Sequence, residues 1–229
     1  MPFAKCLLLL GPGSDGKSLM IKVLREMVGP ENTSAVAFSE MDDQFLRSSL
    51  YQKTVNISTE VGARAIESNY FKAITAGDVI TAAFKHQNSF GFVPYCKLVF
   101  AANRLPRVLD NSDGFYRRFL PIQFKRQFLE GAADTDPFLE EKLFKELSEI
   151  FQWALIGLHR LLKNRRFTDC QETQDLLQNY RRLNSPVICF VEDNFSLEEG
   201  SHVQKVLLYA IIKSALTTLT NPLLAGALP

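Results

Sequence analysis

The sequence carries almost no excess of charge of either sign. Its 229 residues include 26 lysines and arginines against 25 aspartates and glutamates, which gives a formal net charge of +1 at pH 7. This composition excludes a uniformly basic surface of the kind that indicates a nucleic-acid partner. Any nucleic-acid site in the chain must therefore be local, with acidic residues offsetting it elsewhere.

Cysteine is scarce and scattered. The four cysteines form no CxxC pair and no cluster with histidine at the spacing of metal ligands. Cys6 and Cys189 lie in the apolar runs "KCLLLL" and "VICFV". We therefore predict reduced, buried thiols in an intracellular protein, rather than a disulfide framework or a cysteine-bound metal.

Long apolar runs, internal repeats and low-complexity tracts are also missing. The N-terminal run in "MPFAKCLLLLG" is too short for a signal peptide and leads directly into a glycine-rich loop. Lys213 interrupts the apolar stretch near the C-terminus, so no run reaches membrane-spanning length. We expect a soluble protein without a membrane partner, and its 46% of apolar residues are enough for a well-formed core.

Short apolar runs alternate with segments of helical spacing over the first 130 residues. The runs expected to form strands are residues 4–10, 33–39, 53–59, 97–102 and 119–124, and helices are expected over 17–28 and 63–77. This alternation predicts an α/β fold with a central, mostly parallel five-stranded sheet flanked by helices.

The pattern becomes helical after residue 130. One long amphipathic helix is expected over residues 136–164, and further helical segments follow it. The Gly/Ala/Asp-rich segment 130–137 marks a predicted boundary between a core of residues 1–130 and a helical C-terminal region of residues 131–229.

The stretch "GPGSDGKS" fits the pattern G-x-x-x-x-G-K-[ST], between an apolar strand and a helix as the pattern requires. Its glycines let backbone N–H groups surround phosphate oxygens, and the helix N-terminus adds its positive end. Lys17 suits the β- and γ-phosphates, and the Ser18 hydroxyl suits Mg²⁺. The sequence thus predicts a P-loop for ATP and Mg²⁺, made of Gly11, Pro12, Gly13, Ser14, Asp15, Gly16, Lys17 and Ser18.

Two features qualify this prediction. The alternative is a plain glycine-rich turn between strand and helix, which the surrounding pattern disfavours. Asp15 is out of place, because an acid close to phosphates is unfavourable unless its side chain points to solvent or to a neighbouring subunit.

Polar residues also flank three of the other predicted strands. Glu60 follows "VNIST", a position where an acid organises Mg²⁺ and water. Asn103 follows "KLVFAA", a position where an amide positions the attacking water. Arg117 and Arg118 directly precede "FLPIQF". Guanidinium groups at a subunit edge reach a neighbour's γ-phosphate as an arginine finger. The alternatives are a solvated acid, an asparagine that opens a turn, and surface arginines that pair with Asp110 or Asp113.

The segment "AAFKHQNSFGF" predicts a β-hairpin within residues 77–93, with Lys85 and His86 at its tip. Lys85 suits a nucleic-acid phosphate as a point charge. Phe84, Phe90 and Phe92 are expected to brace the hairpin, with stacking of Phe84 or Phe90 on a base as the alternative. A solvated tip is the alternative.

Taken in this order, "GPGSDGKS", "VNISTE", "FKAITAGDVITAAFKHQNSFGFVP", "KLVFAANRLP" and "GFYRRFLPIQF" resemble the motifs of superfamily 3 helicases, which are AAA+-like P-loop NTPases. The resemblance is strongest to the phage and plasmid primase-helicases, which are related to the poxvirus primase-helicase. It covers residues 4–125, with weaker similarity in "NYRRLNSPVICFVEDNF".

The resemblance implies an ATP-driven motor that acts as a homo-hexamer on single-stranded DNA. It would unwind the replication fork or origin of a phage, plasmid or related mobile element, in the cytoplasm of the host cell. It implies that Lys17 and Ser18 bind phosphate and Mg²⁺, and that Glu60 is the catalytic acid near Mg²⁺. Asn103 would be the sensor. Arg118 would be the arginine finger, with Arg117 as second choice. Lys85 and His86 would contact the DNA.

Two departures from the family pattern matter. Glu60 stands alone where relatives often have paired acids, so Mg²⁺ would depend more on Ser18 and water. Relatives carry priming, origin-binding or oligomerisation elements before the first strand, which here begins at residue 4, so a fragment or a short version is expected. The helical C-terminal region would correspond to the start of a winged-helix module.

Two other functions stay open at this point. A small P-loop nucleotide kinase would use "GPGSDGKS" but has no role for the hairpin or Asn103. A truncated module would bind nucleotide or DNA without hydrolysing ATP.

Overall fold

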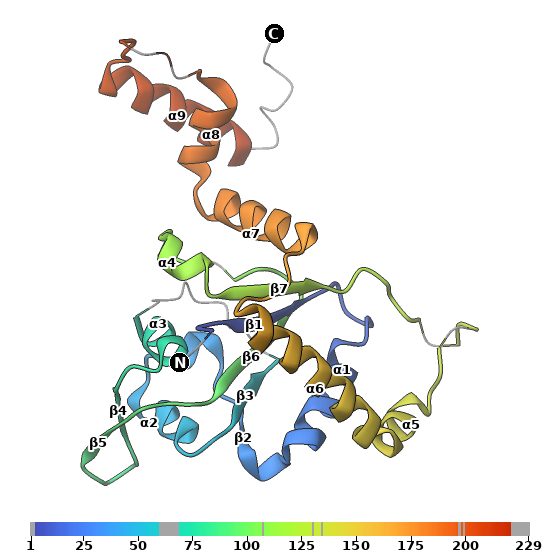
Figure 1. The fold of residues 1–229 in the computed structure, drawn as a ribbon. Coiled ribbons are helices and arrows are strands. Elements are labelled where there is room, and N and C mark those ends of the chain that lie inside the picture. The colour runs from blue at the N-terminus through green and yellow to red at the C-terminus, as the bar shows by residue number, and fades with distance from the viewer. Residues whose placement is uncertain are drawn as a thin grey trace. The chain divides into compact units, whose positions relative to one another are not determined.

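Figure 1 shows the fold in a computed structural model, which describes residues 3–59, 69–106, 108–129, 131–133, 135–196, 198 and 200–220. The chain divides into two compact units, Met1–Asn184 and Ser185–Pro229. The second unit contains helices α8 (Pro186–Asn194) and α9 (Lys205–Thr220).

The first unit carries all the strands that the structure describes. These strands are β1 (Cys6–Leu10), β2 (Thr33–Ser34), β3 (Val55–Ser58), β4 (Ile80–Ala83), β5 (Ser89–Phe92), β6 (Lys97–Ala102) and β7 (Phe119–Gln123). Its described helices are α1 (Lys17–Val28), α2 (Gln44–Arg47), α3 (Asn69–Ala76), α4 (Asp113–Tyr116), α5 (Leu139–Lys145), α6 (Leu147–Asn164) and α7 (Gln171–Asn184), with short 3₁₀ turns η1 (Pro30–Asn32), η2 (Phe38–Glu40) and η3 (Ser48–Leu50).

The main sheet has the strand order β2-β3-β6-β1-β7, and every pairing in it is parallel. The predicted α/β fold with a parallel five-stranded sheet flanked by helices is therefore confirmed. The carboxyl ends of parallel strands meet at one edge of a sheet, which is where ligands bind in open α/β folds. The loop after β1, Thr59 after β3 and Asn103 after β6 all leave the sheet at this edge.

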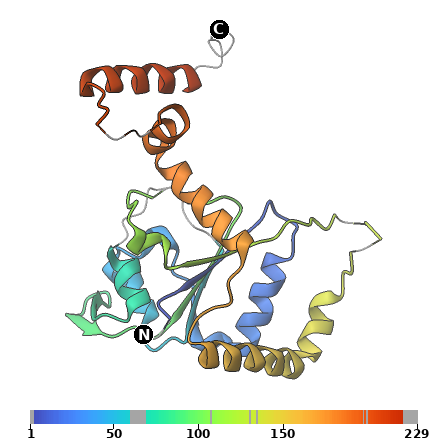
Figure 2. The same cartoon turned by 45° about the horizontal axis from the view of Figure 1, so that its top comes forward.

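Alternate residues of β1 pack on opposite faces of the sheet, as a strand buried on both sides requires. Cys6, Leu8 and Leu10 join a core that also contains Phe38, Phe71, Ile74, Phe100, Phe115, Phe119 and Tyr180. Leu7 and Leu9 join a second cluster with Ile21 and Leu24 of α1. Figure 2 accordingly shows α1 on one side of the sheet, with α5 and α6 beside it, and α3 on the other.

β2 is shorter than the predicted strand 33–39, because the chain leaves the sheet after Ser34. The buried side chain of Asn56 on β3 fixes this departure. Its Oδ1 accepts hydrogen bonds from the Val36 N–H at 2.8 Å and the Ser34 hydroxyl at 2.9 Å, and its Nδ2 donates to the Val36 carbonyl at 2.9 Å. The Asn56 side chain therefore replaces the main-chain hydrogen bonds that a longer β2 would have made with β3.

β4 and β5 form a separate antiparallel pair, which confirms the predicted hairpin. The hairpin packs on the rest of the unit through the buried Ile80 and the partly buried Phe92, and it is also bonded to the buried side chain of Arg47. Arg47 donates from Nε to the Thr81 carbonyl on β4 at 3.0 Å and from Nη1 to the Met41 carbonyl at 2.8 Å. Its guanidinium also lies 3.5 Å from the ring centre of Tyr70 on α3. One residue thus joins the hairpin, the α2 region and α3.

The region after β7 differs in two respects from the sequence expectation. The stretch 136–164 forms two helices, α5 and α6, which meet at Glu146 with φ −100° and ψ 14°. Helix α7 lies beyond the boundary predicted at 130–137, yet it packs on β7 and buries Tyr180 in the core of the first unit. Among the described helices, none has the length and apolar composition needed to cross a membrane.

Candidate nucleotide-binding site

The loop of residues 11–18 joins β1 to α1 and winds tightly. Gly13, Ser14 and Gly16 all have positive φ, at 107°, 50° and 88°. Gly16 directly precedes the first turn of α1, where the N–H groups of a helix have no partner within the helix. The loop therefore presents backbone donors at a helix N-terminus, the arrangement that favours an anion.

Lys17 and Asp15 form an ion pair inside this loop, and each residue is only 6% exposed. The Lys17 ammonium also donates to the Gly11 carbonyl at 2.9 Å. The Asp15 carboxylate accepts from the main-chain N–H groups of Gly13 and Lys17, each at 3.3 Å. The Asp15 side chain therefore does not point to solvent, because it turns inward onto the donors of its own loop.

These contacts change the acidity of Asp15. Burial alone raises the pKa of the Asp15 carboxyl, but the hydrogen bonds from Lys17 and Gly13 outweigh burial and hold that pKa below its ordinary value. The carboxylate is therefore ionised at neutral pH.

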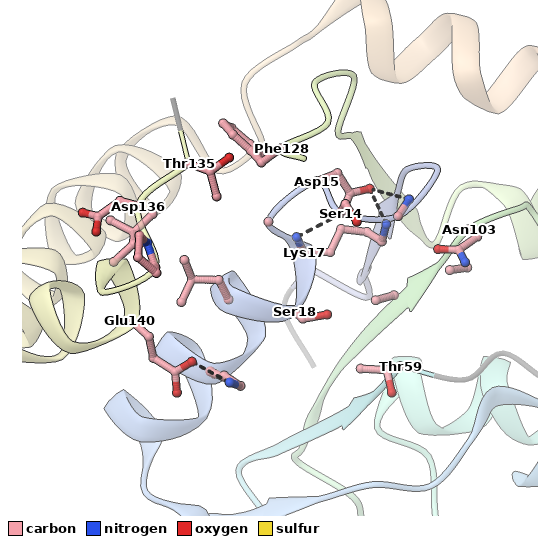
Figure 3. A pocket seen from close by; sticks show the side chains of 18 of the residues that line it. Ser14, Asp15, Lys17, Ser18, Thr59, Asn103, Phe128, Thr135, Asp136 and Glu140 are labelled. Carbon is pink, nitrogen blue, oxygen red and sulfur yellow. Dashed lines mark hydrogen bonds and ion pairs between the residues drawn. The ribbon is translucent and has the colours of Figure 1, made fainter. Parts of the chain in front are cut away.

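A cavity of about 700 Å³ opens beside the loop at the carboxyl edge of the sheet (Figure 3). Its volume lies in the range of roughly 300–1,000 Å³ that small-molecule sites occupy. The residues that line it are Gly13, Ser14, Asp15, Gly16, Lys17, Ser18, Leu19, Lys22, Thr59, Ala101, Ala102, Asn103, Arg104, Phe128, Thr135, Asp136, Pro137, Leu139 and Glu140.

The structure brings most of the predicted nucleotide-site residues to this cavity. Ser18 and Asn103 are exposed within it, and Asn103 directly follows β6, which lies beside β1 in the sheet. Glu60 lies outside the described residues, but Thr59, the residue directly before it, lines the cavity. Gly11 and Pro12 line a second cavity, which shares Asn103 and Arg104 with the first.

Sequence reasoning missed the far wall of the cavity, which follows β7. The Phe128 N–H donates to the Ser14 carbonyl at 2.6 Å, and the Gln127 Nε2 donates to the Gly13 carbonyl at 3.1 Å. These bonds hold the half-buried Phe128 against the loop, and Leu19 and Leu139 belong to the same lining. The sequence offers little to find it, because Phe128 lies in irregular chain between a strand and a linker.

The two acids with described side chains on this wall already have cationic partners. Glu140 pairs with Lys22 at 2.5 Å, and Asp136 pairs with Lys142 at 2.5 Å. In the part of the chain that the structure describes, no three His, Cys, Asp or Glu residues gather as a metal site. The hydroxyl of Ser18, exposed in the cavity, is an oxygen donor of the kind that suits Mg²⁺.

The two candidate arginines have different surroundings. Arg118 is half-buried, and it donates from Nε to the Thr75 hydroxyl on α3 at 2.9 Å and from Nη1 to the Gly114 carbonyl. Burial and the neighbouring Arg117 lower the pKa of the Arg118 guanidinium. The Arg117 side chain is exposed.

The acids considered as partners for these arginines also make other contacts. Asp110 pairs with Lys72 on α3 at 2.8 Å. Asp113 pairs with Arg181 on α7, also at 2.8 Å.

The hairpin tip is a turn closed by a bond from the Gln87 N–H to the Phe84 carbonyl at 3.0 Å. Lys85 and His86 occupy its two central positions, both side chains are exposed, and His86 has φ 64°. Below the tip the rings of Phe84 and Phe90 stack at 5.1 Å, and Tyr51 contacts both Phe90 and Phe92 edge-on. The phenylalanines therefore brace the hairpin, as one of the two sequence interpretations had it.

Known proteins resemble parts of this chain. A family model described as "Family of unknown function (DUF5906)" matches residues 9–118. The protein named "Putative helicase L207/L206" of Acanthamoeba polyphaga mimivirus is 28% identical over 151 residues. That similarity covers 60% of this chain and 15% of the viral protein, so the chain spans a small part of the curated relative that it matches.

Solved structures agree on the fold. One apo structure of the NrS-1 C terminal region matches with a TM-score of 0.60 and 16% identity, and covers 95% of this chain and 55% of the other. Its A form matches with a TM-score of 0.59 and 15% identity, over 93% of this chain and 54% of the other. At these identities the likeness supports the α/β fold alone, and the chain spans just over half of each structure.

Proposed function

We propose that the first unit is the ATPase motor of a DNA helicase of superfamily 3. The observation that carries this proposal is the cavity at the carboxyl edge of the sheet, which the loop with Lys17, the hydroxyl of Ser18 and the amide of Asn103 line together. The similarity to a viral protein named as a helicase supports the choice of a motor.

In this function the loop N–H groups and the Lys17 ammonium bind the phosphates of ATP, and the Ser18 hydroxyl contributes to Mg²⁺ binding. Mg²⁺, when bound, neutralises charge on the phosphates. Asn103 orients the attacking water from the end of β6. Glu60 acts as the general acid-base group after β3, a role assigned from the sequence and from the position of Thr59 in the lining.

The nucleoside part of ATP would lie against the apolar residues of the cavity. Phe128, Leu19 and Leu139 offer apolar surface there, and an aromatic ring of this kind stacks on a base. We propose Phe128 as the base-contacting residue, because its backbone bond to Ser14 fixes it at a constant distance from the phosphate-binding loop.

Hydrolysis would depend on assembly, which we propose to be a homo-hexameric ring. The arginine finger must reach out of its own subunit, and the exposed Arg117 is free of the bonds that hold Arg118 to Thr75 and Gly114. The geometry therefore favours Arg117 as the finger, although the motif pattern favours Arg118.

The hairpin would be the DNA-contacting element. The Lys85 ammonium and the His86 imidazole are exposed at the central positions of the turn, where they can contact backbone phosphates. The stacked phenylalanines and Tyr51 below them make the tip a stiff support, so movement of the hairpin would move the contact. Single-stranded DNA at a replication fork or origin is the proposed substrate.

A complete helicase of this kind would act in replication of a phage, plasmid or related mobile element inside the host cell. Primase or origin-binding domains are proposed as partners, in the same polypeptide or separate. We also propose a core of residues 1–130, on which helix α7 of the C-terminal region packs, and the start of a winged-helix module within that C-terminal region.

A second candidate is a module that binds DNA and nucleotide but does not hydrolyse ATP. The ion pair between Asp15 and Lys17 favours it, because the lysine that should bind phosphate is already paired. ATP hydrolysis measured with and without single-stranded DNA separates the two candidates. The motor predicts hydrolysis that DNA stimulates and that Lys17→Ala abolishes, whereas hydrolysis unchanged in Lys17→Ala would refute it.

A further inference from the structure

Asp15 stands where a phosphate group would be expected. Its carboxylate takes hydrogen bonds from the main-chain N–H groups of Gly13 and Lys17 and forms an ion pair with the Lys17 ammonium. These three groups, here called the loop donors, are the ones that a phosphate-binding loop offers to its ligand. All three are directed at one carboxylate of the same loop.

The loop is shaped around this carboxylate. A Cβ atom on Gly11 would lie 2.0 Å from the Asp15 Oδ2 and 2.9 Å from the Phe124 carbonyl oxygen. Any larger residue at position 11 would therefore displace the carboxylate or the backbone of the neighbouring segment. Asp15 itself is 6% exposed, so water does not substitute for its contacts.

We infer that Asp15 is an internal ligand of the phosphate site, and that a nucleotide binds by displacing its carboxylate from the loop donors. This inference rests on the proposed function, because it takes the loop as the binding site for phosphate. It goes beyond that function by naming the residue that sets which anions bind.

The displacement has a consequence for specificity. A carboxylate brings one negative charge and two oxygens, so an anion with similar charge gains little by replacing it. A triphosphate carries several charges and more oxygens, and it engages Lys17 together with the backbone donors. The cost of displacing the Asp15 carboxylate is the same for every anion, so it lowers the affinities for polyphosphate and for inorganic phosphate by a similar factor. A polyphosphate keeps measurable affinity because it makes more contacts, whereas the weaker binding of inorganic phosphate is suppressed, a threshold that the sequence pattern of the loop does not imply.

Asp15→Asn tests this inference, because asparagine keeps the size and the acceptor oxygen of aspartate but loses the charge. Binding of ATP is measured by titration calorimetry, and binding of inorganic phosphate is measured as a shift in the thermal unfolding midpoint. Loss of the Asp15 carboxylate as a competitor should tighten ATP binding by about tenfold or more. The free energy of a hydrogen bond to a charged group corresponds to a factor of this size in affinity. Inorganic phosphate should stabilise Asp15→Asn at concentrations that leave the parent unaffected.

Glu140→Gln is the matched control. It removes one negative charge from the same cavity without touching the loop donors, since Glu140 pairs with Lys22. An increase in ATP affinity equal to that of Asp15→Asn would show a general effect of charge and overturn the inference.

The other outcomes also decide the matter. Equal or weaker ATP binding by Asp15→Asn overturns the inference and leaves the proposed function intact, provided that the parent binds ATP. Binding by the variant but not by the parent supports the inference and refutes a motor in the parent. If neither protein binds ATP or phosphate while both unfold cooperatively, both the inference and the proposed function fail.

Discussion

The Arg118 guanidinium donates a hydrogen bond from Nε to the Thr75 hydroxyl, 2.9 Å away on α3. The Thr75 side chain is buried, and its hydroxyl donates in turn to the Phe71 carbonyl of its own helix at 2.8 Å. Helix α3 follows the segment that contains Glu60 and ends just before the hairpin. Arg118 is thus bonded to the helix that connects the proposed catalytic acid with the proposed DNA contact.

Arg117→Ala should abolish ATP hydrolysis by the assembled protein while leaving ATP binding within about threefold of the parent. Loss of an arginine finger costs about 10³-fold or more in turnover, because the guanidinium stabilises the transition state in a neighbouring site. Steady-state hydrolysis and calorimetric titration measure the two effects. Arg118→Ala should instead lower the thermal unfolding midpoint, since it leaves the buried Thr75 hydroxyl with one partner fewer.

Mixing provides the control for this prediction. Lys17→Ala lacks the phosphate contact but keeps the finger, and Arg117→Ala has the reverse defect. Mixed assemblies should recover part of the activity, because some sites then receive both groups from different subunits. Absence of any recovery, with assembly confirmed by mass, would contradict a finger supplied by Arg117.

Lys85→Ala combined with His86→Ala should abolish unwinding and DNA-stimulated hydrolysis but leave ATP binding unchanged. Both side chains are exposed at the turn, so their removal should not disturb the aromatic rings below them. Removing the Lys85 cation should also reduce the magnitude of the slope of log affinity against log salt for single-stranded DNA by about 0.7. Lys145→Ala, which removes an exposed lysine from α5, is the control and should keep the parental slope. Unwinding at the parental rate in the double variant would show that the tip of the hairpin is a solvated turn without a role in DNA binding.

Arg47→Met should loosen the attachment of the hairpin to the α2 region and to α3. The substitution keeps much of the side-chain volume but leaves the Thr81 and Met41 carbonyls without their charged donor, at a cost of about 2–4 kcal/mol in the free energy of unfolding. Unwinding should fall more than basal ATP hydrolysis, because the hairpin is no longer joined to α3 through Tyr70. Chemical denaturation and the two activities are the measurements. A parallel fall of both activities would mean that Arg47 only supports the fold.

The sequence predicted the fold well because its signals are local. The apolar runs that became β1, β3, β6 and β7 are buried in parallel strands, and the run of β1 is buried on both faces. The short β2 was not predictable in the same way. Its end depends on Asn56, which is twenty residues away along the chain from Val36 and contacts it only after the sheet has formed.

The candidate site was predictable where motifs lie in continuous sequence. The loop of residues 11–18 and Asn103 were found this way, and residues 13–18 of the loop line the cavity together with Asn103. Phe128, Arg47 and the inward position of Asp15 were not found, because each depends on contacts between segments or on the path of the loop backbone. A pattern gives the residue types of a loop, but the direction of the Asp15 side chain follows from the positive φ values around it.

Phe128→Ala should weaken ATP binding while leaving tripolyphosphate binding unchanged. An aromatic ring that stacks on a base contributes about 1–3 kcal/mol, which is fivefold or more in affinity. Tripolyphosphate offers phosphates but no base, so it reports on the loop donors alone. Phe128→Trp keeps the stacking surface and should retain ATP affinity. Equal losses for both ligands in Phe128→Ala would place the effect in the bond between Phe128 and Ser14 rather than in base contact.

The contribution of Asp15 to stability should depend on pH. Its pKa in the folded protein lies below the ordinary value of about 3.9, so its ion pair with Lys17 stabilises the nucleotide-free protein fully above that value. The stabilisation is lost as the pH falls through the lowered pKa, where the folded carboxylate takes up a proton. At pH 7 the parent should exceed Asp15→Asn by about 1–3 kcal/mol in the free energy of unfolding. The difference should shrink between pH 4 and pH 2, as measured by denaturant unfolding of the two proteins in parallel. A difference that stays constant over this range would show that Asp15 acts through its shape and not through its charge.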